Sequence, residues 1–203
     1  CNPYSSSLIG GYVYDPDFSD DFYEDLNKIL PSCQVLQFAG GEPTILKNSC
    51  LKVLQWCIDN NHTHLKILFN TNGTAPVSKF EKLLSHFKQI FLNVSIDAFG
   101  ERDEHIRQGT KWKIKDKNFK DYVTLQKDLG RKKFRVEINP TIQTLNIGYF
   151  DELYDYGQEM NVIVFPQNIV NVPTKYSALN LPQKIKKQYR GLIHWDCNYI
   201  RIY

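Results

Sequence analysis

Apolar residues gather in short runs along the chain, and amphipathic segments separate these runs. Five runs rich in Val, Ile, Leu and Phe predict β-strands, at 33–39, 65–71, 90–97, 134–142 and 161–167. Most of them show little alternation between polar and apolar positions, which is typical of strands that are covered on both faces. The pattern therefore predicts buried strands.

Between the strands, apolar residues recur with the spacing of one face of a helix. The predicted helices cover 15–30, 49–61, 77–89, 118–130, 149–160 and 183–193. Strand and helix alternate with a unit of roughly thirty residues, the size of a βα repeat. The sequence therefore predicts an α/β fold with a parallel sheet and right-handed crossovers.

Length and charge narrow the possible functions. The chain has 203 residues, and single α/β domains of about 200 to 250 residues are ordinary. Its net charge of +3, from 25 basic and 22 acidic residues, is too balanced to indicate a nucleic-acid partner. The densest basic stretch, "KWKIKDK" at 111–117, predicts a solvated loop. No apolar run is long enough to cross a membrane and no signal peptide is present, so we expect a cytoplasmic protein.

The cysteines do not predict a disulfide framework. They are odd in number and irregularly spaced: Cys1, Cys33, Cys50, Cys57 and Cys197. Cys50 and Cys57 are seven residues apart in a helical pattern, so core packing explains them best, and Cys33 directly precedes a strand. The sequence begins with Cys1 instead of Met and ends in a strand-like pattern, and we therefore expect it to be part of a longer protein.

Every predicted strand ends in polar or glycine residues. They are Gly40, Gly41 and Glu42; Asn70, Thr71, Asn72 and Gly73; Ser95 and Asp97; Asn139, Thr141, Thr144 and Asn146; and Gln167 and Asn168. One such strand end is usually a turn, but in parallel α/β folds ligands bind beyond the carboxyl ends of the strands. Five polar ends on one rim would suit a zwitterionic ligand that carries a ribose.

Two of these strand ends, and a third segment that follows Asp97, resemble motifs of the radical S-adenosylmethionine (SAM) enzyme superfamily. "GGEP" at 40–43 resembles the Gly-Gly-Glu-Pro motif that holds the ammonium group of SAM, and "NVSIDA" at 93–98 resembles the fourth-strand motif. "HIRQG" at 105–109 is similar to a segment of the peptide-modifying branch in which an Arg contacts the SAM carboxylate. The resemblance extends from Cys1 to about Phe165.

The resemblance implies a partial (β/α)6 TIM-like barrel over 1–172 that lacks its first strand. A carboxy-terminal helix and the start of an auxiliary extension would occupy 173–203. The implied cofactor-binding residues are Gly40, Gly41, Glu42, Pro43, Asn72, Ser95, Asp97, Arg107 and Asn146. Among these, Glu42 and the Gly40-Gly41 backbone would hold the ammonium group and Arg107 the carboxylate. Ser95, Asp97 and Asn146 would contact the ribose or the substrate, and no catalytic residue is assigned.

The family also binds a [4Fe-4S] cluster through the three thiolates of a C-x3-C-x2-C motif. "CNPYSS" at the start of the sequence resembles the third cysteine and its followers. The resemblance therefore gives Cys1 to the cluster, places two further cysteines upstream, and implies that the 203 residues alone are inactive. Cys197 is either an incidental thiol or a ligand of an auxiliary cluster, as in the twitch and SPASM-like subsets.

The implied activity is the reductive cleavage of SAM to a 5′-deoxyadenosyl radical, which takes a hydrogen atom from a substrate. A peptide is the favoured substrate, and a flavodoxin or ferredoxin would donate the electron. Two alternatives stay open. One is a metal-independent barrel enzyme that uses Asp97, Glu42 and His105 for acid/base chemistry. The other is a degenerate, cluster-free barrel that acts as a binding or scaffold module.

Overall fold

The computed structural model describes residues 15–38, 42–166 and 168–189. The chain divides into two compact units, which are described separately below. The first unit is Cys1–Val94 with Ile114–Val136, and the second is Ser95–Lys113 with Glu137–Tyr203. The domain boundary expected near residue 172 stays a prediction.

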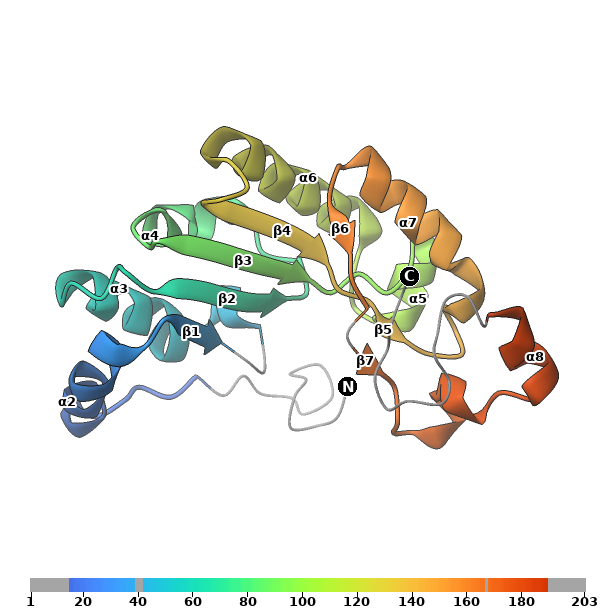
Figure 1. The fold of residues 1–203 in the computed structure, drawn as a ribbon, viewed down its shortest axis with the longest axis horizontal. Coiled ribbons are helices and arrows are strands. Elements are labelled where there is room, and N and C mark those ends of the chain that lie inside the picture. Colours follow the sequence, from blue (N-terminus) through green and yellow to red (C-terminus); the bar gives the residue numbers. More distant parts are fainter. Residues whose placement is uncertain (1–14, 39–41, 167, 190–203) are drawn as a thin grey trace. The chain divides into compact units, whose positions relative to one another are not determined.

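A parallel sheet organises the fold. Figure 1 shows β1 (Val35–Phe38), β2 (Lys66–Thr71) and β3 (Gln89–Val94) as three arrows that point the same way, in agreement with their parallel pairing. β4 (Phe134–Ile138) and β6 (Ile163–Val164) complete a five-stranded sheet in the order β1-β2-β3-β4-β6. The predicted α/β class with a parallel sheet is therefore confirmed, whereas closure into a barrel stays a prediction.

Burial alternates along the strands of the first unit. In β2, Ile67, Phe69 and Thr71 are buried, whereas Leu68 is half-buried and Asn70 is exposed. Successive side chains of a strand point to opposite faces of the sheet, so one face is the core and the other is partly open. The expectation that both faces are covered is therefore wrong for β2. The sequence shows little polar alternation there because apolar residues such as Leu68 also occupy the more open face.

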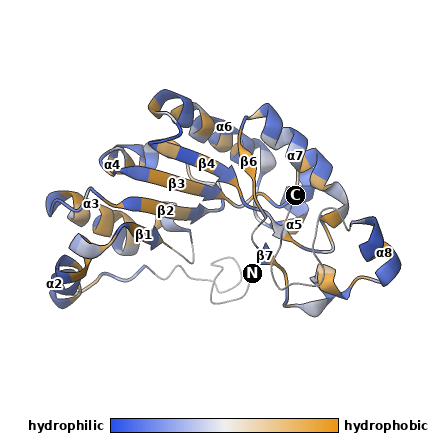
Figure 2. Cartoon of the chain, in the orientation of Figure 1, coloured by the Kyte–Doolittle hydropathy of each residue, from blue (hydrophilic) through white to orange (hydrophobic). Residues whose placement is uncertain are grey.

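The helices of the first unit are α2 (Asp20–Ile29), α3 (Lys52–Asp59) and α4 (Glu81–Ser85), and most of α6 (Trp112–Leu129). Short turns of 3-10 helix lie at Leu30–Ser32, Pro43–Ile45 and Val77–Lys79, and a π turn at Lys47–Leu51 leads into α3. Figure 2 shows apolar residues concentrated on β2 and β3 and polar residues on the outer helices. This distribution is the one expected of helices that pack one apolar face on a sheet.

α6 begins earlier than the helix predicted at 118–130. Most of the stretch 111–117, expected to be a solvated loop, forms its first turns, so that expectation is wrong. Charges one turn apart support an exposed helix, and the pairs here are Lys117–Asp121 and Lys120–Asp116, both at 2.7 Å. The helical state thus gives Asp116 and Lys117 of this stretch oppositely charged partners one turn away.

The second unit is built around shorter elements. The strand predicted at 134–142 ends at Ile138, because Pro140 lacks the N–H that a sheet interior needs. The chain then forms β5 (Thr141–Ile142), which pairs in parallel with β7 (Asn168–Ile169). The core of this unit includes Ile142, Ile147, Phe150 and Ala178.

The helices of the second unit are α5 (Glu101–Ile106), α7 (Phe150–Glu159) and α8 (Gln183–Gln188), with 3-10 turns at Ile147–Tyr149, Thr174–Tyr176 and Ala178–Asn180. The sequence pattern did not predict α5, which is short. Each helix among the described residues is too short or too polar to span a membrane.

Asp15 caps the start of the helical segment that leads into α3, although it lies more than thirty residues upstream. Its Oδ2 accepts hydrogen bonds from the backbone N–H of Lys47 (2.8 Å) and Asn48 (3.1 Å), and Oδ1 from the N–H and hydroxyl of Ser49 (both 2.8 Å). Partial burial raises the pKa of the Asp15 carboxyl, but the hydrogen bonds outweigh burial and the net pKa is lowered. The carboxylate therefore stabilises the fold while it is ionised.

We expect Asp15→Ala to lower the free energy of unfolding by about 0.5 to 2 kcal/mol at neutral pH, the usual cost of losing a helix cap. Because the folded-state pKa is depressed, this contribution is fully present above the unfolded pKa of about 4 and disappears as the pH falls through the folded value. Urea unfolding at pH 7 and pH 3 measures both effects. Asp25→Ala is the matched control, since Asp25 pairs only with exposed Lys28 on the described surface. Equal stabilities of wild type and Asp15→Ala at pH 7 would contradict the assignment.

Candidate functional site

Glu42 is the centre of a polar cluster in the first unit. It caps the 3-10 turn Pro43–Ile45, and only 8% of its surface is exposed. Its Oε1 accepts hydrogen bonds from the hydroxyls of Thr44 (2.5 Å) and Thr71 (2.7 Å) and from the N–H of Thr44 (3.3 Å). Its Oε2 accepts one from the N–H of Asn72 (2.5 Å). The carboxylate thus ties the segment after β1 to the end of β2.

The two oxygens of Glu42 are not used equally. A carboxylate offers about four acceptor positions, two on each oxygen. The described contacts crowd Oε1 and leave Oε2 with the N–H of Asn72. An additional cationic donor would therefore be accepted at Oε2. The position of this oxygen is fixed by the N–H of Asn72.

The turn after β2 holds the N–H of Asn72 toward Glu42. Gly73 has a φ of +77°, and its N–H donates to the Thr71 hydroxyl at 3.1 Å. The side-chain amide of Asn118 donates to the Gly73 carbonyl at 3.1 Å. A Cβ atom on Gly73 would lie 3.0 Å from Val94 Cγ1 and 3.3 Å from Lys115 Cγ. The turn therefore needs glycine both for its backbone angle and for its close packing.

We expect Gly73→Ala to destabilise the protein by about 1 to 2 kcal/mol, since an L-residue in the left-handed region costs roughly this amount. For a chain of this size the melting temperature should fall by about 2 to 8 °C. Differential scanning calorimetry measures the shift. Gly130→Ala is the matched control, because Gly130 has a similar φ of +81° but its Cβ would meet no atom within 4 Å. A smaller loss for Gly130→Ala isolates the packing contribution, and equal losses would contradict it.

Asp97 is the centre of a second polar cluster, in the second unit. It follows β3 and is 4% exposed. Its Oδ1 accepts a hydrogen bond from the N–H of Thr141 (2.7 Å), and its own N–H donates to Asp103 Oδ1 (2.8 Å). Its carbonyl accepts one from the side-chain amide of Asn146 (2.9 Å). The position of Asp97 is therefore fixed from three sides.

Arg107 directly follows α5 and lies against the second carboxylate oxygen of Asp97, Oδ2. The distance from Arg107 Nε to Asp97 Oδ2 is 2.7 Å, and the two side chains are 22% and 5% exposed. The Nε–H bond does not point at the oxygen, so Nε is buried without a well-formed hydrogen bond and the contact is an ion pair. The backbone N–H of Arg107 donates to the Asp103 carbonyl at 2.7 Å. The inner edge of the guanidinium thus lies on the buried carboxylate.

Asn146 braces the same cluster. Its Nδ2 donates to the carbonyls of Asp97 and Thr141 (both 2.9 Å), and its Oδ1 accepts from the N–H of Gln143 (2.8 Å). Only 1% of its surface is exposed. The amide is therefore engaged within the protein, where it supports the position of Asp97. Ser95, which is also predicted to contact the ligand, directly follows β3 in the chain. Its side chain is half-buried.

The structure brings some predicted residues together within each unit. Glu42, Pro43 and Asn72 gather in the first unit, and Asp97, Arg107 and Asn146 gather in the second. Gly40, Gly41, Cys1 and Cys197 lie outside the described residues. The sequence pattern did not reveal Thr44 and Asp103, whose side chains hold Glu42 and Asp97. The signal for Thr44 was its place two residues after a capping carboxylate, a spacing typical of local side-chain turns.

The described cysteines are packing residues. Cys50 and Cys57 are buried, as predicted, and Cys33 is half-buried. Burial, with a smaller contribution from the charges of Asp15 and Glu42, raises the pKa of the Cys50 thiol far above its usual range. Burial also raises the pKa of Cys57 to about 11. Within the described ranges, no three His, Cys, Asp or Glu side chains gather in a way that could hold a metal ion.

Comparison with solved structures reveals the same fold in another protein. The first match is SuiB of Streptococcus suis bound to S-adenosylmethionine, with a TM-score of 0.54 and 19% identity. The chain is similar in fold to part of SuiB. Two further SuiB structures match, one of SuiB itself (0.52, 18%) and one bound to the precursor peptide SuiA (0.51, 16%).

The matches to SuiB cover 76% of this chain but 36%, 36% and 34% of the three SuiB chains. The chain therefore spans about a third of the length of SuiB. No protein-family model matches the chain, and no curated protein matches it. At these identities the likeness to SuiB is a likeness of fold.

Proposed function

We propose that this chain binds SAM and forms the core of a radical SAM enzyme that acts on a peptide. The observation that carries the proposal is Arg107, whose guanidinium is placed by a buried carboxylate at the end of a parallel strand. Its terminal nitrogens make no hydrogen bond with the described residues and are not buried. Arg is suited to bind a carboxylate through two parallel hydrogen bonds, and the SAM carboxylate is the anion that the sequence resemblance implies.

Glu42 carries a negative charge, opposite in sign to that of Arg107. We propose that its Oε2 receives the SAM ammonium group, because Oε1 is already crowded by two threonine hydroxyls. The N–H of Asn72 keeps this oxygen in place before the ligand arrives. A preorganised acceptor loses little on binding, since it needs no rearrangement. Asn72 itself therefore contributes to the site through its backbone.

Ser95, Asp97 and Asn146 remain the proposed neighbours of the ribose or the substrate. Both oxygens of Asp97 have protein partners, and so does the amide of Asn146. Asp97 and Asn146 are also almost fully buried. We therefore propose that they support the site and do not contact the ligand directly. Ser95 is the member of the three with partial exposure.

The described residues do not fit an iron-sulfur cluster. Such a cluster needs several converging thiolate ligands, whereas no group of three His, Cys, Asp or Glu side chains among the described residues could hold a metal ion. In the family that the sequence resembles, the cluster supplies the electron that cleaves SAM. Cys1 stays a predicted cluster ligand, Cys197 stays either an incidental thiol or a ligand of an auxiliary cluster, and a flavodoxin or ferredoxin stays the predicted electron donor.

A peptide is the proposed substrate. The support is the fold shared with SuiB, which has been solved with the precursor peptide SuiA, together with the likeness of "HIRQG" to the peptide-modifying branch. The acid/base alternative is less well supported. It would use Asp97 and Glu42, but both carboxylates are nine-tenths buried or more and held by internal hydrogen bonds.

SAM-dependent thermal stabilisation tests the proposal. A ligand that binds only the folded state stabilises it by about 2.7 kcal/mol at a hundredfold excess over its Kd. We expect the melting temperature of the anaerobically prepared protein to rise steadily with SAM concentration. Adenosine at the same concentrations is the control, because it lacks the amino-acid end of SAM. A melting temperature that does not respond to SAM would contradict the proposal.

A further inference from the structure

Arg107 depends on one side chain for its placement. Among the described residues, Asp97 is its charged partner, at 2.7 Å from Oδ2 to Nε. The Nε atom is buried, whereas the side chain as a whole is 22% exposed. The guanidinium therefore has a buried edge on Asp97 and an accessible edge formed by the two terminal nitrogens.

Asp97, in turn, is held independently of Arg107. The N–H of Thr141 fixes Oδ1, Asp103 receives the backbone N–H, and Asn146 binds the carbonyl. The carboxylate is therefore a rigid reference point at the end of β3, and a long flexible side chain rests against it. Rigid groups that fix the rotamer of a binding residue are how precise sites are built.

We propose that Asp97 is a positioning residue that presents the terminal nitrogens of Arg107 to an anionic ligand. The inference rests on the proposed function, in which this anion is the SAM carboxylate. Asp97 would not itself touch the ligand, because 95% of its side chain is buried. Its role is to keep the accessible edge of the guanidinium in a single orientation.

Asp97 could also weaken the binding of an anionic ligand, because its negative charge offsets the positive charge of Arg107. The two effects are separated by geometry. Asp97 contacts the buried Nε, where no ligand can approach, so it does not compete for the terminal nitrogens. Without it, the ligand would have to order the flexible side chain as well as bind it, and ordering is unfavourable. We therefore expect positioning to outweigh charge neutralisation.

Asp97→Asn is the first test, because asparagine keeps an oxygen for the N–H of Thr141 and removes the charge facing Arg107. Calorimetric titration of the anaerobic protein should give a SAM affinity roughly fivefold to tenfold below wild type, within the usual coupling of residues in contact. The affinity for 5′-methylthioadenosine, which lacks the carboxylate, should not change. A loss of affinity for both ligands would mean a merely structural role and would overturn the proposal.

A double-mutant cycle is the second test. In combination with Arg107→Lys, Asp97→Asn should add little further loss, because lysine lacks the planar fork that Asp97 orients. Asp97→Glu keeps the charge but displaces it by one methylene, and it carries the test if Asp97→Asn does not fold. It should also weaken SAM binding; wild-type affinity would overturn positioning. Arg102→Lys on the same helix is the control, since Arg102 pairs with Glu152 and both are about 40% exposed.

The outcomes distinguish a failure of SAM binding from a failure of the positioning role of Asp97. If wild type does not bind SAM, the proposed function fails and the inference falls with it. If wild type binds SAM but Asp97→Asn binds it equally or more tightly, the positioning role alone is overturned. Losses that simply add in the double variant would also overturn it, because two independent contacts would then be involved.

Discussion

Glu42→Gln is expected to lower the affinity for SAM by about tenfold or more while the fold stays stable. The substitution removes the negative charge that faces the ammonium group and keeps the shape of the side chain. Hydrogen bonds to charged groups contribute about 1.5 to 3 kcal/mol, and each 1.4 kcal/mol is a tenfold change in Kd. The glycines that precede Glu42 in the sequence are left intact.

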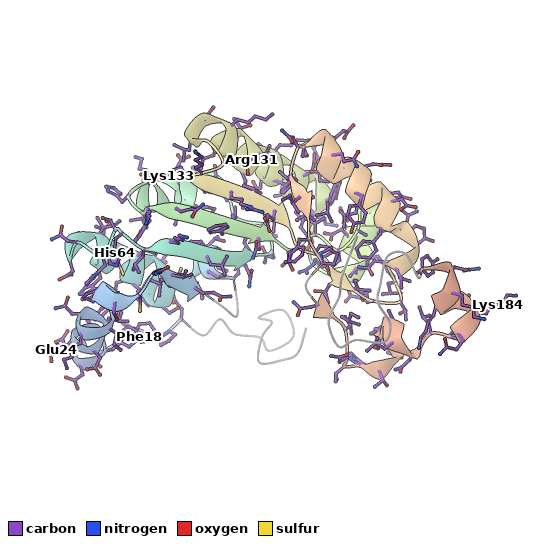
Figure 3. The ribbon with its side chains drawn as sticks, viewed as in Figure 1. Phe18, Glu24, His64, Arg131, Lys133 and Lys184 are labelled. Carbon is purple, nitrogen blue, oxygen red and sulfur yellow. The ribbon has the colours of Figure 1, made fainter. Side chains whose placement is uncertain are left out.

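Stability should change little because the contacts of Glu42 can be rearranged. The glutamine oxygen can accept from the N–H of Asn72, and its NH2 group can donate to the hydroxyls of Thr44 and Thr71, which accept as well as donate. Only the long contact from the N–H of Thr44, at 3.3 Å, loses its acceptor. Calorimetric titration and thermal unfolding measure the two quantities on one preparation. Glu24→Gln is the control, because Glu24 is an exposed residue of α2 (Figure 3). An unchanged SAM affinity for Glu42→Gln would remove Glu42 from the site.

Arg107→Lys is expected to weaken SAM binding by a comparable factor. The planar guanidinium can bind a carboxylate through two parallel hydrogen bonds while it rests on Asp97, whereas the lysine ammonium is a point charge with a different reach. The net charge of the protein does not change, so a loss of affinity reports geometry. Charge-assisted hydrogen bonds contribute about 1.5 to 3 kcal/mol, and losing one corresponds to about tenfold or more in Kd.

The same titration checks the Arg107 prediction. Raising the salt concentration should narrow the difference between wild type and variant only partly, because Arg107 is largely buried and salt screens exposed charges most. If Arg107 is an ordinary loop residue, Arg107→Lys will bind SAM as wild type does. That result would leave the carboxylate of the ligand without its proposed partner.

The elements that the sequence predicts best are those with strong local patterns. The apolar runs "VLQF", "KILFNT" and "QIFLNV" form β1, β2 and β3 almost where the sequence pattern placed them. The amino-terminal turns of α6 were missed because a dense run of lysines is typical of solvent-exposed loops. Their helical state depends on tertiary and side-chain contacts: Trp112 packs on Phe99 and Tyr156, and its N–H donates to Glu104 at 2.6 Å.

The polar residues of the site were predicted by type and place, but their partners were not. Strand-end position identified Glu42 and Asp97 as functional candidates, since ligands of parallel α/β folds bind there. Their hydrogen bonds to Thr71 and Thr141 join residues 29 and 44 positions apart. Such contacts are decided by strand order and register, which no local pattern contains. For the same reason the cap that Asp15 provides to Ser49 could not be read from the sequence.

The proposed function requires that the chain recognises SAM through its amino-acid end. The most direct measurement is a pair of calorimetric titrations of the same anaerobic protein, one with SAM and one with 5′-methylthioadenosine. We expect one SAM per chain, bound at least about tenfold more tightly than 5′-methylthioadenosine, because a single charge-assisted hydrogen bond to the amino-acid end contributes at least that factor. Equal affinities, or no binding of SAM, would contradict the account.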